Sequence, residues 1–88
     1  MFEPISIKEY VELFVRDNPS EKKQVVEERL RDILHAALSG TKCACGNPIW
    51  VIGAAEVGLS CFTCITGGTM PEEDFEIEEH LNYLQKLT

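Results

Sequence analysis

The stretch that decides this fold runs Cys43-Ala44-Cys45-Gly46, then fourteen residues, then Cys61-Phe62-Thr63-Cys64. In structural zinc sites four ligands surround the ion as a tetrahedron, and each close cysteine pair can supply two thiolates. Two such pairs in one short chain have the arrangement of a zinc site. The sequence therefore predicts a structural zinc ion bound by Cys43, Cys45, Cys61 and Cys64.

The residues between the two pairs have the composition of a β-hairpin. Strand-forming residues make up Pro48-Ile49-Trp50-Val51-Ile52, and Leu59-Ser60-Cys61-Phe62 is a candidate partner strand. A turn between them can form at Glu56-Val57-Gly58. Gly46 comes directly after Cys45, where a turn around the sulfurs needs a residue without a side chain. We therefore expect a β-hairpin that brings the two cysteine pairs together.

This segment resembles the zinc ribbons, small folds built on four cysteine ligands. The resemblance covers about residues 42–67, rests on the four cysteines and Gly46, and implies that the cysteines are metal ligands. One residue separates Cys43 from Cys45, where ribbons usually have two. This tighter spacing leaves open iron, an iron–sulfur cluster or a thiol redox role.

Two amphipathic helices are predicted before the cysteines. Ser6 and Glu9 have the spacing of a capping box at the start of the first helix. We expect Asn18 to cap the second helix, Pro19 to be its first residue and Gly40 to end it. The short connector predicts an antiparallel helical hairpin. Its apolar stripes are Ile7, Tyr10, Val11, Phe14 and Val15, and then Val26, Leu30, Ile33, Leu34, Ala37 and Leu38.

The end of the chain is acidic and is predicted to form a helix. Ile77, Leu81 and Leu84 share one helical stripe, which indicates a helix from about Phe75 to Leu87. Residues 72–77 can be helical or extended, because apolar and acidic residues alternate at their end. We expect the acidic side chains to be exposed and to favour the helix start; they are Glu72, Glu73, Asp74, Glu76, Glu78 and Glu79.

These segments together predict a single α+β domain. An N-terminal antiparallel helical hairpin occupies residues 1–40, a zinc-ribbon-like β-hairpin residues 41–68, and a C-terminal acidic helix residues 69–88. A chain of 88 residues is long enough for one domain, and a domain of this size often needs a metal to supplement its core.

The charge of the chain argues against two classes of partner. Its net charge is −7, and affinity for nucleic acid rests largely on Lys and Arg. An acidic surface also repels anionic lipid, and no apolar run is long enough to span a membrane. The start of the chain, Met1-Phe2-Glu3-Pro4, lacks the features of a signal peptide, so we expect a cytoplasmic protein.

No catalytic constellation is evident, and four cysteine ligands close the coordination of a zinc ion. We interpret His35 and His80 as surface residues of their helices. The hairpin would have two apolar faces, formed by Ile49, Trp50, Val51 and Ile52, and one of these faces can contact another protein or a second copy. The function we expect is therefore a non-enzymatic interaction or adaptor module. The alternative is a thiol redox or metal-handling protein that uses the cysteine pairs.

Overall fold

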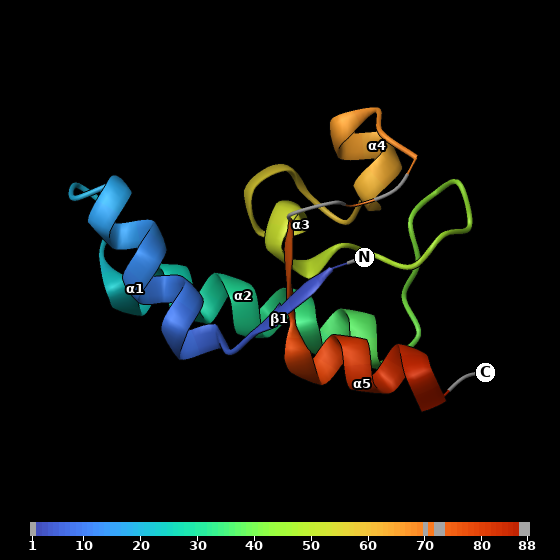
Figure 1. The fold of residues 1–88 in the computed structure, drawn as a ribbon, viewed down its shortest axis with the longest axis horizontal. Coiled ribbons are helices and arrows are strands. Elements are labelled where there is room, and N and C mark those ends of the chain that lie inside the picture. The colour runs from blue at the N-terminus through green and yellow to red at the C-terminus, as the bar shows by residue number, and fades with distance from the viewer. Residues whose placement is uncertain (1, 70, 72–73, 87–88) are drawn as a thin grey trace.

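Residues near the two ends of the chain form a small parallel sheet. In the computed structural model, which describes residues 2–69, 71 and 74–86, β1 (Glu3–Ile5) pairs with β2 (Phe75–Ile77). Parallel strands need a crossover connection, and here nearly the whole chain forms it. The helices of this described part are α1 (Ile7–Asp17), α2 (Lys23–Leu38), α3 (Val51–Val57), α4 (Phe62–Thr66) and α5 (Glu78–Lys86). The molecule is therefore a small α+β protein (Figure 1).

Helix α1 begins as its sequence predicts. The Ser6 hydroxyl oxygen accepts the Glu9 N–H at 3.1 Å, and the hydroxyl donates to the Glu9 carboxylate at 3.2 Å. The Ser6 side chain thus satisfies one N–H group that the first helical turn leaves without a partner, and it contacts the Glu9 side chain of the predicted capping box. The predicted cap of the second helix is wrong. Asn18 instead ends α1, where its side-chain Nδ2 donates to the carbonyl of Phe14 at 2.9 Å, and α2 begins only at Lys23.

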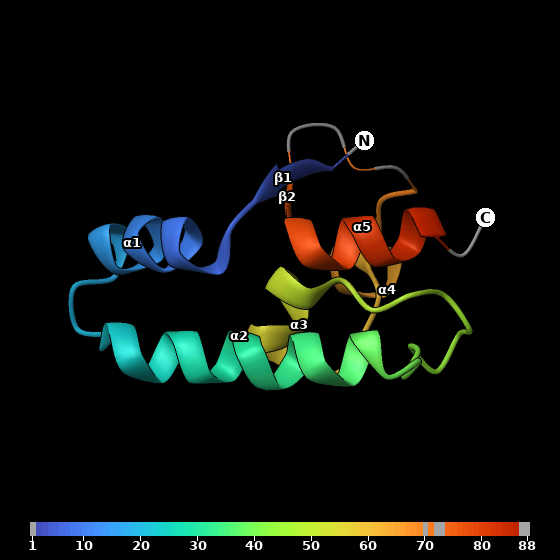
Figure 2. The same cartoon turned by 90° about the horizontal axis from the view of Figure 1, so that it is seen from below.

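Helix α2 runs along the length of the molecule, with α1 and α5 on the same side of it (Figure 2). The chain reverses direction between α1 and α2, and the two helices pack together. Most of the predicted stripe of α2 is buried, but Leu38 is 38 % exposed and lies outside the core. The core is completed by residues from α1, α3, both strands and the loop before α3; it comprises Ile5, Ile7, Val11, Val26, Leu30, Leu34, Ala37, Ile49, Val51, Ile52, Ala54 and Ile77.

The predicted β-hairpin between the cysteine pairs is wrong. Residues Val51–Val57 and Phe62–Thr66 are helices, and only one isolated bridge, Lys42 to Pro48, gives this described segment any antiparallel pairing. The apolar run from Ile49 to Ile52 enters the core instead of forming the faces of a hairpin. The side chains of Ile49, Val51 and Ile52 are therefore buried, and Trp50 remains half-buried.

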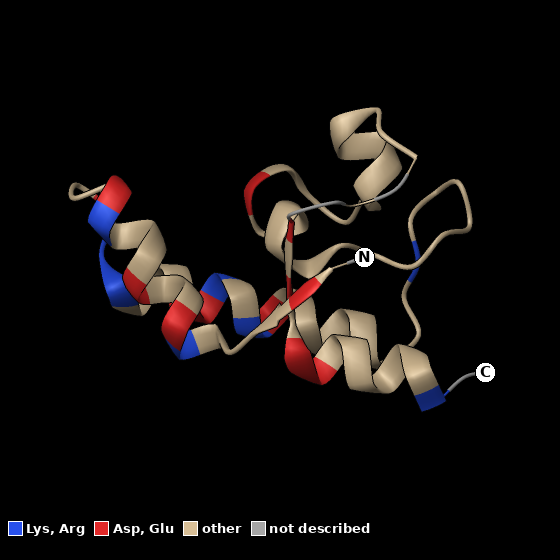
Figure 3. Ribbon diagram, viewed as in Figure 1, with Lys and Arg blue, Asp and Glu red and all other residues tan. Residues whose placement is uncertain are grey.

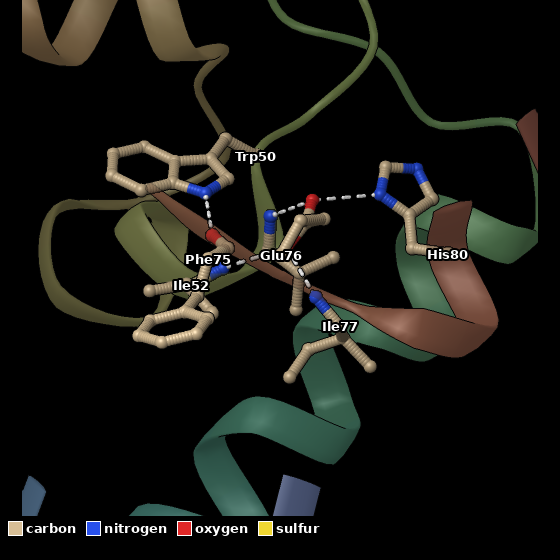
Figure 4. Close-up of polar contacts among 7 residues, drawn as sticks. Trp50, Ile52, Phe75, Glu76, Ile77 and His80 are labelled. Carbon is tan, nitrogen blue, oxygen red and sulfur yellow. Dashed lines mark hydrogen bonds and ion pairs between the residues drawn. The ribbon is translucent and has the colours of Figure 1, made fainter. Parts of the chain in front are cut away.

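Glu76 explains why a helix starts at this point. Its carboxylate accepts the N–H of Val51 at 2.9 Å and that of Ile52 at 3.3 Å, so it caps the first turn of α3 from a distant strand (Figure 4). A carboxylate at a helix N-terminus satisfies free N–H groups and opposes the helix dipole. The expectation that Glu76 is exposed is wrong, because only 1 % of its surface is accessible.

His80 is also buried, against the prediction of a surface residue. It is 1 % exposed, and its Nδ1 lies 2.9 Å from Oε2 of Glu76. Residues Phe75–Ile77 are extended, so the last helix begins at Glu78, and the predicted end at Leu87 lies outside the described residues. Glu76 and His80 thus make a buried side-chain contact between positions four residues apart. This contact joins β2 to α5.

The outer edge of β2 is closed by side chains. The Trp50 indole N–H donates to the carbonyl of Phe75 at 2.8 Å, and the Glu76 carboxylate accepts the N–H of Ile77 at 2.9 Å (Figure 4). On β1, Pro4 has no N–H to offer. An exposed strand edge invites pairing with another chain, and this sheet leaves little of its edge free. Within residues 2–69 and 74–86, no helix combines the length and the apolar character needed to cross a membrane.

Candidate metal centre

The four cysteines come from two separate segments and meet at one point. Cys43 and Cys45 lie in the loop after α2, whereas Cys61 caps α4 and Cys64 lies within that helix. Their sulfur atoms all lie within 4.8 Å of one another, and all four thiols are free. The structure thus brings together all four cysteines that the sequence predicts as ligands.

A tight turn positions the first pair. The Cys43 N–H donates to the Asn47 carbonyl at 3.0 Å, and the Gly46 N–H donates to the Cys43 carbonyl at 2.8 Å. Gly46 has φ +94°, a conformation that residues with a side chain rarely adopt. The glycine after Cys45 therefore serves the turn that the sequence predicts for it.

A short helix positions the second pair. Helix α4 has five residues and none of them is buried, and a helix this short is not stable on its own. Its first turn is capped by the Cys61 sulfur, which accepts the Cys64 N–H at 3.4 Å. Its other anchor is Phe62, whose ring packs edge-on against Trp50 with centroids 5.0 Å apart. Phe62 also contacts the ring of Phe2, and α4 packs against α3, so the cysteines and these apolar contacts together hold α4 in place.

The sulfur distances fit a tetrahedral ion. The Cys45 and Cys61 sulfurs are 3.4 Å apart, and those of Cys43 and Cys64 are 3.6 Å apart. Four Zn–S bonds of about 2.3 Å would place the sulfurs ~3.8 Å from one another. A disulfide would need a separation of about 2.05 Å. The four sulfurs are therefore arranged as a set of metal ligands, and this geometry suits iron as well as zinc.

The ionisation of the cysteines also indicates a need for a cation. Backbone N–H groups, first of Cys45 and then of Cys61, lower the pKa of Cys43 to about 6, and the Cys64 N–H lowers the pKa of Cys61. The pKa of Cys64 is raised to about 12, first by hydrogen bonding with the sulfur of Cys43. Without a cation, Cys43 and Cys61 thus lose their protons more readily than a free thiol, whereas Cys64 resists deprotonation. A divalent ion would remove this resistance.

Little fixed charge surrounds the sulfurs. The cysteine loop and α4 are almost free of charged residues, which lie mainly on α1, α2, the strands and the two ends of α5 (Figure 3). Lys42 is the only basic residue between positions 41 and 70. Cys43 and Cys61 are buried, whereas Cys45 and Cys64 are exposed. A bound ion would therefore sit near the surface, with two of its ligands facing solvent.

Two histidines complete the inventory of candidate ligands, and neither belongs to this site. His35 is exposed on α2, and His80 is held by Glu76. Sequence reasoning missed the buried pair of Glu76 and His80. Its only local signal is an acid four residues before a histidine, a spacing that surface helices also contain.

Comparisons with protein-family models, with curated proteins and with solved structures each found no match for this chain. What the site can bind therefore follows from the four sulfurs and their surroundings.

Proposed function

We propose that this chain is a small zinc-binding protein whose four-cysteine site is structural, and that it acts as a protein-interaction module. The observation that carries the proposal is the convergence of four free cysteine sulfurs within 4.8 Å. Free thiols persist in a reducing compartment, so we place the protein in the cytoplasm.

Zinc is the metal that suits this ligand set best. It prefers thiolate ligands in a tetrahedron and has no redox chemistry of its own. Four protein ligands leave no open position for water or substrate, which is the arrangement of structural sites rather than of catalytic ones. The proposal therefore assigns no enzymatic activity to the site.

The ion would stabilise the part of the molecule that has little core of its own. It would join the loop that carries Cys43 and Cys45 to α4, and α4 in turn holds Phe62 against Trp50. Trp50 makes hydrogen bonds to two separate segments: its backbone N–H donates to the carbonyl of Ser60, and its indole N–H donates to the carbonyl of Phe75. Metal binding would thus order the surface around Trp50.

A second candidate is a thiol redox or metal-handling protein. Two sulfurs, those of Cys45 and Cys64, are exposed, and the pKa of Cys43 is lowered to about 6. Accessible sulfurs and a low thiol pKa are features of reactive cysteines. The two candidates differ in two respects: whether a bound metal protects the thiols from reagents, and whether the fold survives oxidation of the thiols.

Elemental analysis of protein purified without added metal tests the proposal. We expect one zinc per chain, and thiol reagents should react with the cysteines only after a chelator removes it. Cys61→Ser should lose the metal, and Thr63→Ser, a matched change between two ligands, should keep it. The redox alternative would be established if the purified protein holds no zinc and its thiols can be oxidised and reduced reversibly while the fold persists. Iron in place of zinc would establish the metal-handling one.

A further inference from the structure

Helix α1 has a second apolar stripe beside its buried one, whose Tyr10 and Phe14 are only partly buried against the core. Ile7 and Val11 are buried, but Tyr10, Leu13 and Phe14 follow the three-and-four spacing of a neighbouring stripe. Leu13 is 38 % exposed. The rings of Tyr10 and Phe14 stack with centroids 6.0 Å apart, so this face is already ordered.

Opposite this face lies Phe75, the first residue of β2. Phe75 is 39 % exposed and, with Tyr10, Leu13 and Phe14, lines a cavity of about 280 Å³. Six large apolar side chains are exposed in the described part of the chain, and two of them, Leu13 and Phe75, meet here. Exposed apolar side chains that gather at one place mark interaction sites more often than scattered ones do. We call this cavity the α1–β2 groove.

The one charged residue that lines the α1–β2 groove among the described residues is acidic. Asp17 lines it, and none of the described lining residues is Lys or Arg. Burial and the nearby carboxylate of Glu56 raise the pKa of Tyr10, which places a second acid close to the groove. Asp74 directly precedes Phe75 in the chain. A partner with positive charge would complement this surface, whereas a second copy, with the same net charge of −7, would be repelled.

We propose that the α1–β2 groove binds a segment of another protein that inserts one or two large apolar side chains and carries Lys or Arg beside them. The groove lies at or below the lower limit of small-molecule pockets, which hold roughly 300–1,000 Å³, so it fits side chains better than a cofactor. This inference rests on the proposed interaction role and names its surface. No cysteine lines the groove, so the metal site and the groove can be tested separately.

Titration of the zinc-loaded protein with a short amphipathic helical peptide, leucine on one face and lysine on the other, tests the proposal. We expect changes in amide chemical shift to concentrate on α1 and the start of β2, and affinity to fall as salt is added. A twin peptide with glutamate in place of lysine should not bind.

Matched variants decide whether the groove is the site. Leu13→Ser and Phe75→Ser should each weaken binding by about tenfold, the effect of losing an apolar anchor of an interface. Leu38→Ser is the control, because Leu38 has the same exposed fraction of 38 % and does not line the groove. It should change the affinity less than about twofold. Asp17→Asn should reduce the salt dependence.

Three results would overturn the proposal. In the first, all three serine variants weaken binding equally or the shift changes spread over the whole surface, which indicates nonspecific attraction. In the second, the peptide does not bind although the protein holds one zinc per chain; the groove then fails while the metal site stands. In the third, the protein self-associates and Leu13→Ser prevents it, which makes a second copy the occupant. Failure to bind zinc is a separate result that bears only on the proposed metal site.

Discussion

Glu76 is a single buried acid, and the four cysteines are a cluster of weak acids. The protein balances the negative charge of these two centres in different ways. The Glu76 carboxylate accepts three backbone N–H groups at 2.9 to 3.3 Å and faces the His80 ring at 2.9 Å. The Cys61 sulfur accepts the Cys64 N–H at 3.4 Å and the Asn47 amide at 3.9 Å, and it lies 3.4 Å from the Cys45 sulfur. Groups of the chain itself therefore satisfy the hydrogen-bonding capacity of the Glu76 carboxylate. The described residues place no positive charge among these hydrogen bonds to the Cys61 sulfur. The first centre is satisfied by groups of the chain itself, whereas for the second we propose that a bound cation supplies the balancing charge.

Removal of the metal is the strongest test of this difference. Structural zinc contributes roughly 10–16 kcal/mol of binding free energy in small zinc domains, so a chelator should unfold α4 and the cysteine loop. We expect α1, α2 and the sheet to persist, because their core includes no residue of α4. The protein has one tryptophan, and the emission of Trp50 should shift to the red as Phe62 leaves it. Added zinc should reverse this shift. If the chelator changes neither the emission nor the temperature of thermal unfolding, the metal is not structural.

Substitution of Glu76 tests the self-sufficient centre. Glu76→Ala leaves the N–H groups of Val51, Ile52 and Ile77 buried without an acceptor, so we expect a loss of about 3–5 kcal/mol of unfolding free energy. Urea denaturation measures it. The exposed Glu79 is the control, and Glu79→Ala should cost less than about 0.5 kcal/mol. Equal effects of the two variants would show that the buried carboxylate is not needed.

A smaller effect is expected from the turn that carries the first cysteine pair. Gly46→Ala meets no atom within 4 Å but must adopt φ +94°, which costs about 1–2 kcal/mol. We expect weaker zinc binding, measured by competition with a chromogenic chelator. Gly68→Ala is the control, because Gly68 has no positive φ. A Gly46→Ala protein that binds zinc normally would show that the turn is not fixed in this conformation.

The smallest effect should appear in the pH dependence of the metal-free protein. The pKa of Cys43 is lowered from 9.0 to about 6, so its thiolate favours the folded state as pH rises from 6 to 9, and this contribution is lost as pH falls through 6. The pKa of Cys64 is raised to about 12, so above pH 9 that thiol opposes folding. Thiolate absorbance in the ultraviolet should therefore be present at neutral pH. Cys43→Ser should reduce it, and an unchanged spectrum would assign the thiolate elsewhere.

The predictions that the structure bears out depend on residues close together in the chain. The capping box joins Ser6 to Glu9, and the four cysteines form two pairs with short spacers. In both cases the chemistry of nearby residues is enough to specify the geometry. The zinc itself stays a prediction, because the sulfur arrangement accepts more than one metal.

The predictions that fail depend on contacts between distant residues. The run from Ile49 to Ile52 is apolar throughout, and such a run is compatible with a strand or a helix. The carboxylate of Glu76, about 25 residues further along the chain, favours the helix because it caps the first turn of α3. Likewise, nothing near Glu3–Ile5 announces a strand of three residues, because its partner is β2. An acid in an acidic stretch also gives no sign that it is the buried one.

The pairing of β1 with β2 has a consequence for how the protein forms during synthesis. Glu3 lies opposite Phe75, so the first strand must wait for more than 70 further residues before its partner leaves the ribosome. Only fifteen residues separate the two cysteine pairs, and closing a short loop is faster than closing a long one. The metal centre can thus assemble on the nascent chain while β1 is still single. The sheet would then be the last part to form, and premature termination before Ile77 would leave β1 unpaired.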